Sequence, residues 1–340
     1  MKIILITGGA GFIGSNFIEY FLNKYNDYKL INYDKLTYAG NIQNLATVED
    51  NENYVFIKGD ICDSKQLKNV FEEFNPEFVV NFAAETHVDR SIKATDEFIK
   101  TNIEGTQTLL EKAREHEIKK LVHISTDEVY GAVGPSQQVD ETGQLAPNNP
   151  YAASKAAADM LLRAAMKTYR QPINIVRSTN NYGPYQFPEK FIPLVISNAM
   201  HHKKIPIYGS GKNMRDWLYV LDNCRAIELV LNNASPGEIY NVSTNNLISN
   251  LDLAKQILAI MEKPEKYIEF VEDRPGHDFC YAIDSTKIRK ELGWQPNIDF
   301  KIGLQQTVQW YLNHEEWLDD VSTGKYLDNL EKVKQQYPEV

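Results

Sequence analysis

Hydrophobic residues in the first half of the chain are grouped into short apolar runs that alternate with amphipathic segments. The apolar runs indicate buried strands over residues 2–7, 29–33, 54–58, 78–82, 121–124 and 173–177. Between the runs, apolar residues three and four positions apart indicate helices, as in the segment that carries Phe17, Ile18, Phe21 and Leu22. A long helix is expected over residues 95–117. Strands that alternate with helices predict an α/β fold with a doubly wound parallel sheet, the Rossmann architecture.

The pattern loosens after residue 181, where shorter elements alternate with Pro- and Gly-rich turns. We therefore expect a Rossmann domain over residues 1–180 and a smaller substrate-binding domain over residues 181–340, between which the chain can cross back. The tail after Asn313 is polar apart from aromatic residues such as Trp317, Tyr326 and Tyr337. It predicts a peripheral helix to which no role can be assigned.

The composition excludes several classes of protein. The 340 residues include 43% hydrophobic and 24% charged side chains, which is typical of a globular protein. A net charge of −10 argues against a nucleic-acid surface. Three widely separated cysteines and the lack of a His-Glu-x-x-His pattern argue against a metal site and favour a reducing cytoplasm. No uncharged stretch approaches the ~20 residues that span a bilayer, so we expect no membrane segment.

A glycine-rich turn follows the first expected strand and precedes a helix. Gly8, Gly11 and Gly14 allow the backbone to approach a pyrophosphate, which the free N–H groups of the helix N-terminus would bind. Asp34 ends the second strand about 20 residues after Gly14, where a carboxylate accepts hydrogen bonds from the adenosine ribose. Such a carboxylate would repel a 2′-phosphate. The sequence therefore predicts a site for NAD rather than NADP.

The stretch around the fifth strand carries the most chemistry. After the apolar run 121–124 come Thr126, Asp127 and Glu128, and ligands of parallel sheets lie beyond the carboxyl ends of the strands. A hydroxyl, an acid and a base would then lie over a bound ligand. The alternative is that the two carboxylates merely cap the next helix, which is the commoner use of such residues.

Tyr151 and Lys155 open an alanine-rich helix shortly after that strand. Residues four apart lie on one helix face, so a Lys155 ammonium beside the Tyr151 phenol would lower the phenol pKa and create a base. Four other Tyr-x-x-x-Lys pairs occur in the chain, so position rather than spacing singles out this one. The alanines of the helix could belong to the core or could form a dimer interface with the 95–117 helix.

Together these residues resemble the extended short-chain dehydrogenase/reductases, and within them the dTDP-glucose 4,6-dehydratases. The resemblance extends over residues 1–315 and rests on several segments, namely 34–40, 83–91, 126–130, 180–184, 188–190, 215–220 and 274–277. The Asp-Glu pair is its most specific part, because related sugar-nucleotide epimerases lack this acid and base.

The resemblance implies which residues contact each ligand. For NAD these are Gly8, Gly11, Phe12, Ile13, Gly14, Asp34, Lys35, Leu36, Thr37, Asp60, Ile61, Phe82, Ala83, Ala84, Thr101, Tyr151, Lys155 and Asn181. For the nucleotide sugar they are Thr86, Thr126, Asn180, Lys190, Phe191, Pro206, Ile207, Tyr208, Arg215, Asn250, Arg274 and His277. The family also implies a homodimer that acts on dTDP-glucose.

The implied chemistry assigns a role to each catalytic residue. Oxidation at C4 by NAD, with Tyr151 as base and Lys155 as its aid, makes the C5 proton acidic. Glu128 then removes that proton, Asp127 protonates the departing C6 hydroxyl, and Thr126 holds the C4 oxygen. Because two adjacent carboxylates disfavour double ionisation, one of them is expected to stay protonated.

Four alternatives stay open. The enzyme could be an epimerase, a decarboxylase or a dehydratase of another nucleotide sugar such as UDP-glucose, or the protein could be a catalytically inactive NAD-binding sensor. Departures from the family pattern are found at Asn223, at Phe279 and Cys280 and, as a mild change from serine, at Thr86. They leave the choice between dTDP and UDP undecided.

Overall fold

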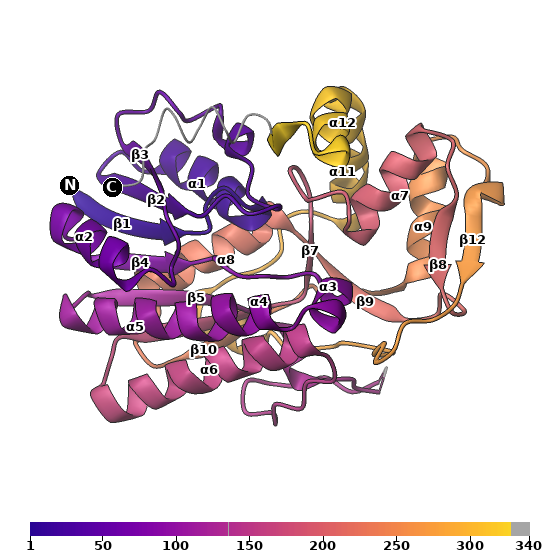
Figure 1. The fold of residues 1–340 in the computed structure, drawn as a ribbon. Helices are drawn as coiled ribbons and strands as arrows, with labels where there is room; N and C mark the ends of the chain where they lie inside the picture. The colour runs from indigo at the N-terminus through magenta and orange to yellow at the C-terminus, as the bar shows by residue number, and fades with distance from the viewer. Residues whose placement is uncertain (135, 328–340) are drawn as a thin grey trace.

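A seven-stranded parallel sheet forms the centre of the molecule (Figure 1). In this computed structural model, which describes residues 1–134 and 136–327, the strands are β1 (Lys2–Thr7), β2 (Tyr28–Asp34), β3 (Tyr54–Lys58), β4 (Phe78–Asn81), β5 (Lys120–Thr126), β6 (Ile173–Ser178) and β10 (Ile239–Val242). Their order is β10-β6-β5-β4-β1-β2-β3. This sheet confirms the predicted doubly wound parallel fold.

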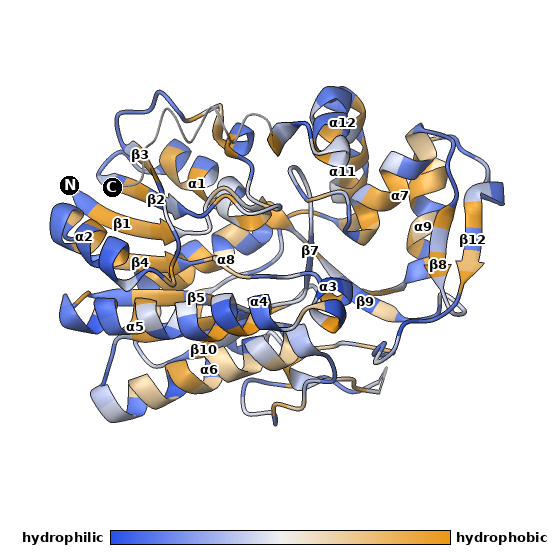
Figure 2. Ribbon diagram, in the orientation of Figure 1, coloured by the Kyte–Doolittle hydropathy of each residue, from blue (hydrophilic) through white to orange (hydrophobic). Residues whose placement is uncertain are grey.

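Helices cover both faces of the sheet. One face carries α1 (Phe12–Lys24) and α8 (Val220–Asn233), which pack apolar side chains such as Phe17 and Leu231 onto the strands. The other face carries α2 (Ser64–Phe74), α5 (Thr106–Glu115) and α6 (Pro150–Tyr169). The expected helix 95–117 is present as α4 (Asp96–Phe98), a π-helical segment (Ile99–Gly105) and α5. Figure 2 shows the resulting apolar strands between helices with polar outer faces.

Smaller elements after residue 180 build a separate part of the molecule. Its sheets are formed by β7 (Asn180–Tyr182), β9 (Met214–Tyr219) and β11 (Leu247–Ser249), and by β8 (Ile205–Tyr208) with β12 (Ile268–Val271). Its helices are α7 (Phe191–Met200), α9 (Asn250–Ile260), α11 (Phe300–Asn313) and α12 (Glu315–Thr323). Two other short helices, α3 (Val88–Lys93) and α10 (Thr286–Leu292), are not part of this group. Because α8 and β10 return to the large sheet, the chain crosses between the two parts. The predicted boundary at residue 180 stays a prediction.

The predicted helix after Asn313 is present as α12, but its aromatic residues are not peripheral. The Trp317 indole N–H donates to Asn44 Oδ1 at 3.0 Å, and the buried Tyr326 phenol donates to the Tyr38 carbonyl. Both acceptors belong to the loop that follows β2. The C-terminal segment therefore holds that loop, whereas Tyr337 lies outside the described residues.

Among the helices of residues 1–134 and 136–327, none is long and apolar enough to cross a bilayer.

Candidate active site

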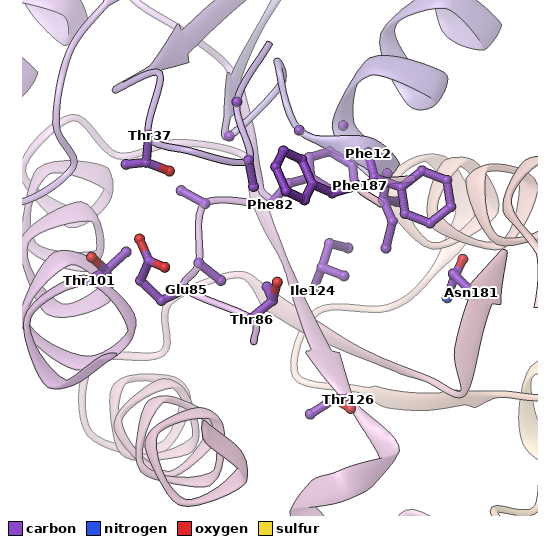
Figure 3. A pocket seen from close by; sticks show the side chains of 18 of the residues that line it. Phe12, Thr37, Phe82, Glu85, Thr86, Thr101, Ile124, Thr126, Asn181 and Phe187 are labelled. Atoms are coloured by element: carbon purple, nitrogen blue, oxygen red, sulfur yellow. The ribbon is translucent and has the colours of Figure 1, made fainter. Parts of the chain in front are cut away.

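A pocket lies at the carboxyl ends of the central strands, where the sequence predicted it (Figure 3). Its lining includes every predicted cofactor residue except Leu36, which is buried beneath the loop after β2. All five predicted catalytic residues also line it, as do four of the predicted substrate residues, namely Thr86, Thr126, Asn180 and Lys190. The fold thus joins the two sets of residues in one cavity.

Glycines are required in this loop because its backbone packs closely against neighbouring backbone. A side chain at Gly8, whose φ is +73°, would lie 2.5 Å from the Ala83 nitrogen, and one at Gly14 would lie 2.4 Å from the Gly8 oxygen. Gly11 begins α1 without a side-chain cap, so the first N–H groups of the helix have no capping acceptor. This arrangement provides the backbone donors that a pyrophosphate needs.

Asp34 fixes this loop as well as facing the pocket. Its Oδ2 accepts from the Ala10 N–H at 2.8 Å and its Oδ1 accepts from the Leu36 N–H at 2.8 Å. Burial raises the pKa of the carboxyl, which is 7% exposed. Each carboxylate oxygen has a second lone pair, so Asp34 can still accept from ribose hydroxyls.

The strand β5 ends in Thr126, and the two carboxylates follow in a short 3-10 turn. The capping bond of this turn comes from Thr126, whose Oγ1 accepts from the Glu128 N–H at 3.2 Å. The carboxylates of Asp127 and Glu128 are therefore not used as caps and both line the pocket. Their side chains are available for chemistry.

The two carboxyl groups have different surroundings. Asp127 is 2% exposed, and burial, followed by the charge of Glu128, raises its pKa to about 7. The hydroxyl groups of Thr179 and Thr126 donate to it at 3.1 and 3.2 Å. Glu128 is half-buried and its Oε2 accepts from Asn149 Nδ2 at 3.2 Å. Asp127 is thus suited to donate a proton and Glu128 to accept one.

Tyr151 lies in the first turn of α6, which Asn149 caps through a bond from the Ala152 N–H to its Oδ1. Burial, together with the charge of Glu128, raises the pKa of Tyr151. Lys155 Nζ donates to the Ile124 carbonyl at 2.7 Å and contacts His123 Nε2 at 3.1 Å, and the lowering of the Tyr151 pKa by Lys155 stays a prediction. Burial lowers the pKa of Lys155 to about 8.

Two buried residues that the sequence did not single out control the surroundings of Lys155. Asn81 Oδ1 accepts from the Ala83 N–H at 3.1 Å, so its Nδ2 faces His123 Nδ1 at 3.0 Å as a donor. Burial lowers the pKa of His123 well below its usual value, which keeps the ring neutral. The ring proton then lies on Nε2, and this N–H can bond to Lys155 Nζ only when the amine is neutral and offers its lone pair. No sequence pattern distinguishes His123 from an ordinary core residue.

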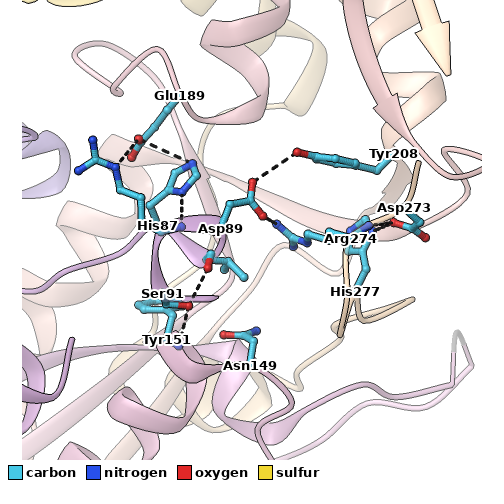
Figure 4. Close-up of polar contacts among 12 residues, drawn as sticks. His87, Asp89, Ser91, Asn149, Tyr151, Glu189, Tyr208, Asp273, Arg274 and His277 are labelled. Carbon is cyan, nitrogen blue, oxygen red and sulfur yellow. Dashed lines mark hydrogen bonds and ion pairs between the residues drawn. The ribbon is translucent and has the colours of Figure 1, made fainter. Parts of the chain in front are cut away.

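Three cationic or titratable groups that were predicted to bind the substrate have partners within the protein, and Figure 4 shows two of them, Arg274 and His277. Lys190 Nζ donates to the Thr86 carbonyl at 2.8 Å, and burial lowers its pKa. Arg274 pairs with Asp89 at 3.3 Å, while its Nε is buried and has no hydrogen-bond partner among the described residues. His277 contacts Asp273 at 2.6 Å. An orphaned guanidinium donor beside other cations suits an anion such as a diphosphate.

The remaining predicted substrate residues lie outside the pocket lining and are Phe191, Pro206, Ile207, Tyr208, Arg215, Asn250, Arg274 and His277. The side chain of Ile207 is fully buried in the core of the smaller part, so only its backbone can face a ligand. Arg215 donates to the carbonyls of Met214, Phe279 and Asp278. Of the positions that depart from the family pattern, Asn223 and Cys280 are buried and Phe279 is 47% exposed.

These features define a class of protein. A dinucleotide loop at a Rossmann sheet, together with a tyrosine and a lysine one helical turn apart in the same pocket, is the arrangement of a short-chain dehydrogenase/reductase. The carboxylate pair adds an acid and a base that hydride transfer alone does not require.

Comparison with known proteins narrows this class. The family model described as GDP-mannose 4,6 dehydratase matches residues 5–307. The dTDP-glucose 4,6-dehydratase of Neisseria meningitidis serogroup B is 47% identical over 96% of this chain and 98% of its own length. The crystal structure of the Bacillus anthracis dTDP-glucose 4,6-dehydratase in complex with NAD is 48% identical, with a TM-score of 0.88 over 94% of this chain and 100% of that one. The Streptomyces venezuelae enzyme DesIV, solved with NAD bound, is 42% identical, with a TM-score of 0.92 over the same shares.

The chain belongs to the dTDP-glucose 4,6-dehydratase family.

Proposed function

We propose that this protein is a hydro-lyase that uses NAD to convert dTDP-glucose into dTDP-4-keto-6-deoxy-glucose, a precursor of deoxysugars. The observation that carries the proposal is the pair of adjacent carboxyl groups with opposite surroundings beside Tyr151. An epimerase needs a hydride acceptor and a base for the sugar hydroxyl, whereas it needs no acid and base for elimination. The NAD-binding relatives of the same family support the choice of cofactor.

The order of steps follows from the acidity of the sugar. A C5 proton next to an ordinary carbinol is not acidic, so C4 has to be oxidised to a ketone before water can leave from C5 and C6. Bound NAD supplies the hydride acceptor for C4 and returns the hydride to C6, so the reaction has no net redox change. The glycine loop and Asp34 would hold this cofactor.

The protein's own residues move the protons. Tyr151 takes the proton of the C4 hydroxyl, and Thr126 holds the C4 oxygen. Glu128 takes the C5 proton. Asp127, whose pKa of about 7 keeps a large fraction protonated at neutral pH, gives its proton to the C6 hydroxyl as it leaves.

The nucleotide part of the substrate is held elsewhere. We assign the diphosphate to Lys190, Arg274, Arg215 and His277, because Lys190 lines the cavity and the buried Arg274 Nε has no hydrogen-bond partner among the described residues. Asp34 favours NAD, since a 2′-phosphate would meet a buried carboxylate.

A comparison of two substrates tests the assignment. Purified protein is incubated with dTDP-glucose and, separately, with UDP-glucose, and the 4-keto-6-deoxy product is measured. We expect product from dTDP-glucose at a higher kcat/KM than from UDP-glucose. Faster turnover of UDP-glucose would reassign the substrate, and a C4 epimer in place of the keto sugar would make the protein an epimerase.

The two half-reactions can also be separated by substitution. In the double variant Asp127→Asn, Glu128→Gln, the shape of both side chains is kept but elimination loses its acid and base, which costs about 10²–10⁴-fold. With substrate added, NADH absorbance should rise and persist in proportion to the enzyme. Tyr151→Phe should instead form little NADH, because its defect precedes elimination. Normal turnover by the double variant would contradict the roles of the carboxylates.

We further propose a homodimer in the reducing cytoplasm. One face of α6 exposes Ala153, Met160 and Ala164 and partly exposes Ala157, and Met160 is 54% exposed. The helix packs beside α5, whose exposed residues Glu111 and Arg114 are charged, so the surface of small and apolar side chains is that of α6. Small residues allow the close approach of helices from a second copy. Three free cysteines are consistent with a reducing compartment.

A further inference from the structure

Three side chains link the proposed base to the segment that follows Arg274. The Tyr281 hydroxyl lies 3.3 Å from Glu128 Oε2 and 2.6 Å from Asp278 Oδ2. Asn148 Nδ2 donates to the other oxygen of Asp278 at 2.7 Å. Tyr281 and Asp278 are 2% and 6% exposed. The contacts therefore form a chain from Glu128 through Tyr281 to a second carboxyl group.

The number of hydrogens fixes the direction of these bonds. A phenol has one hydrogen to donate, and an ionised carboxylate can only accept. The contact of Tyr281 with Asp278 is much shorter than its contact with Glu128, so the phenol hydrogen lies toward Asp278. The Tyr281 oxygen consequently presents a lone pair to Glu128. Only the protonated form of Glu128 can donate to that lone pair.

We propose that Asp278 is a positioning residue for the elimination step, because it orients the Tyr281 hydroxyl so that its oxygen stabilises the protonated form of Glu128. That form arises when Glu128 has taken the C5 proton, so the arrangement favours the transition state of proton removal. This inference rests on the proposed function. It adds two residues to the site that lie more than 140 positions from Glu128 in the sequence.

The surrounding groups hold the arrangement in place. The Arg215 guanidinium lies 4.3 Å from the centre of the Tyr281 ring and donates to the Asp278 carbonyl at 3.0 Å. Asn149 Oδ1 accepts the capping bond of α6 from the Ala152 N–H, which fixes the orientation of the Asn149 amide. The amide nitrogen of Asn149 then donates to Glu128 Oε2. The titratable groups on which the charge of Glu128 acts are Asp127, Tyr151, Lys190 and Tyr281.

The substitution Asp278→Asn tests the proposal because an amide can donate where the carboxylate only accepted. Its N–H would turn the Tyr281 hydrogen toward Glu128 and stabilise the ionised base. Glu128 would then remain ionised to lower pH and be a weaker base. We expect the rate of product formation in a single turnover to fall about tenfold at its plateau, the size expected from reversing one hydrogen bond to a charged group. The acidic limb of its pH profile should move about one unit lower.

The initial rise of NADH in the same single turnover should stay within about twofold of wild type, because oxidation at C4 does not use Glu128. In a Tyr281→Phe background, Asp278→Asn should cause no further change, since Asp278 acts only through the phenol. Asp140→Asn is a matched control, as it removes one exposed carboxylate whose hydrogen bonds among the described residues come from the N–H and the hydroxyl of Thr142. It should leave both half-reactions unchanged.

The possible results separate the inference from the proposed function. An unmoved acidic limb in a folded Asp278→Asn variant, or an equal loss in the Tyr281→Phe background, would refute the positioning role while wild-type turnover stands. If wild-type protein forms no keto sugar from dTDP-glucose, the proposed function fails and the inference fails with it. A shift of the limb that requires Tyr281 would establish the role.

Discussion

Asp127→Asn should make the folded protein more stable while removing its general acid. Asp127 is almost fully buried, and its pKa is raised from 3.8 to about 7 because burial and the neighbouring Glu128 oppose its ionisation. The folded protein therefore binds this proton more tightly than the unfolded chain does. Ionising Asp127 destabilises the folded state, and an amide of the same shape carries no such cost.

The size of the effect follows from linkage between protonation and folding. Moving a carboxyl pKa from 3.8 to about 7 corresponds to about 4 kcal/mol of unfolding free energy once both states are ionised. The sign is fixed: the contribution of Asp127 to wild-type stability falls as pH rises from about 4 to about 7 and is then level. The gain from Asp127→Asn should accordingly be small near pH 4 and should grow by about 2–3 kcal/mol between pH 5 and pH 8.

Urea unfolding of wild type and variant at pH 5 and pH 8 measures this growth. Taking the difference at each pH cancels the titration of other groups. In a Glu128→Gln background the gain should shrink without vanishing, because burial contributes more than Glu128 does. A gain that is equal at the two pH values would refute the argument, since it would show that Asp127 ionises in the folded protein as freely as in the unfolded chain.

Two further predictions concern other parts of the molecule. Ala157→Arg places a long charged side chain on the exposed face of α6 and should yield folded monomers, so an unchanged mass in light scattering would remove this helix from the dimer interface. Trp317→Phe keeps a ring but removes the bond to Asn44, which in turn bonds to the Ala10 carbonyl in the glycine loop. The loss of one hydrogen bond should speed NAD release about fivefold without changing the KM for the sugar. An unchanged release rate would show that the C-terminal segment does not act on the cofactor loop.

Much of the large sheet could be predicted because its strands are apolar runs bounded by turns. The prediction failed to find β10, which has only four residues and joins the sheet beside β6 after an excursion of about 60 residues. Its place in the sheet is determined by packing between distant segments, which local patterns do not encode.

The same limit applies to the site. Much of the pocket lining consists of residues that end or begin regular elements, and such positions can be recognised in a sequence. They are the glycine loop, Thr126, Asp127, Glu128 and the start of α6. The sequence did not indicate where the Lys155 side chain would point, because its direction depends on the His123 ring, which lies beside it in the folded protein. Tyr281 was missed for a related reason: it reaches Glu128 from 153 positions away, outside any motif.

Burial explains how one pair of adjacent carboxyl groups can hold two different roles. Asp127 faces the end of β6, where Thr179 bonds to it and water is excluded, so its neutral form is favoured. Glu128 faces the wider cavity, where Asn149 donates to its carboxylate, so its ionised form is available as a base. The charge of Glu128 also helps to keep Asp127 protonated. The acid and the base are therefore assigned by the position of β5 against β6, and exchanging the two side chains would leave the buried position as the acid.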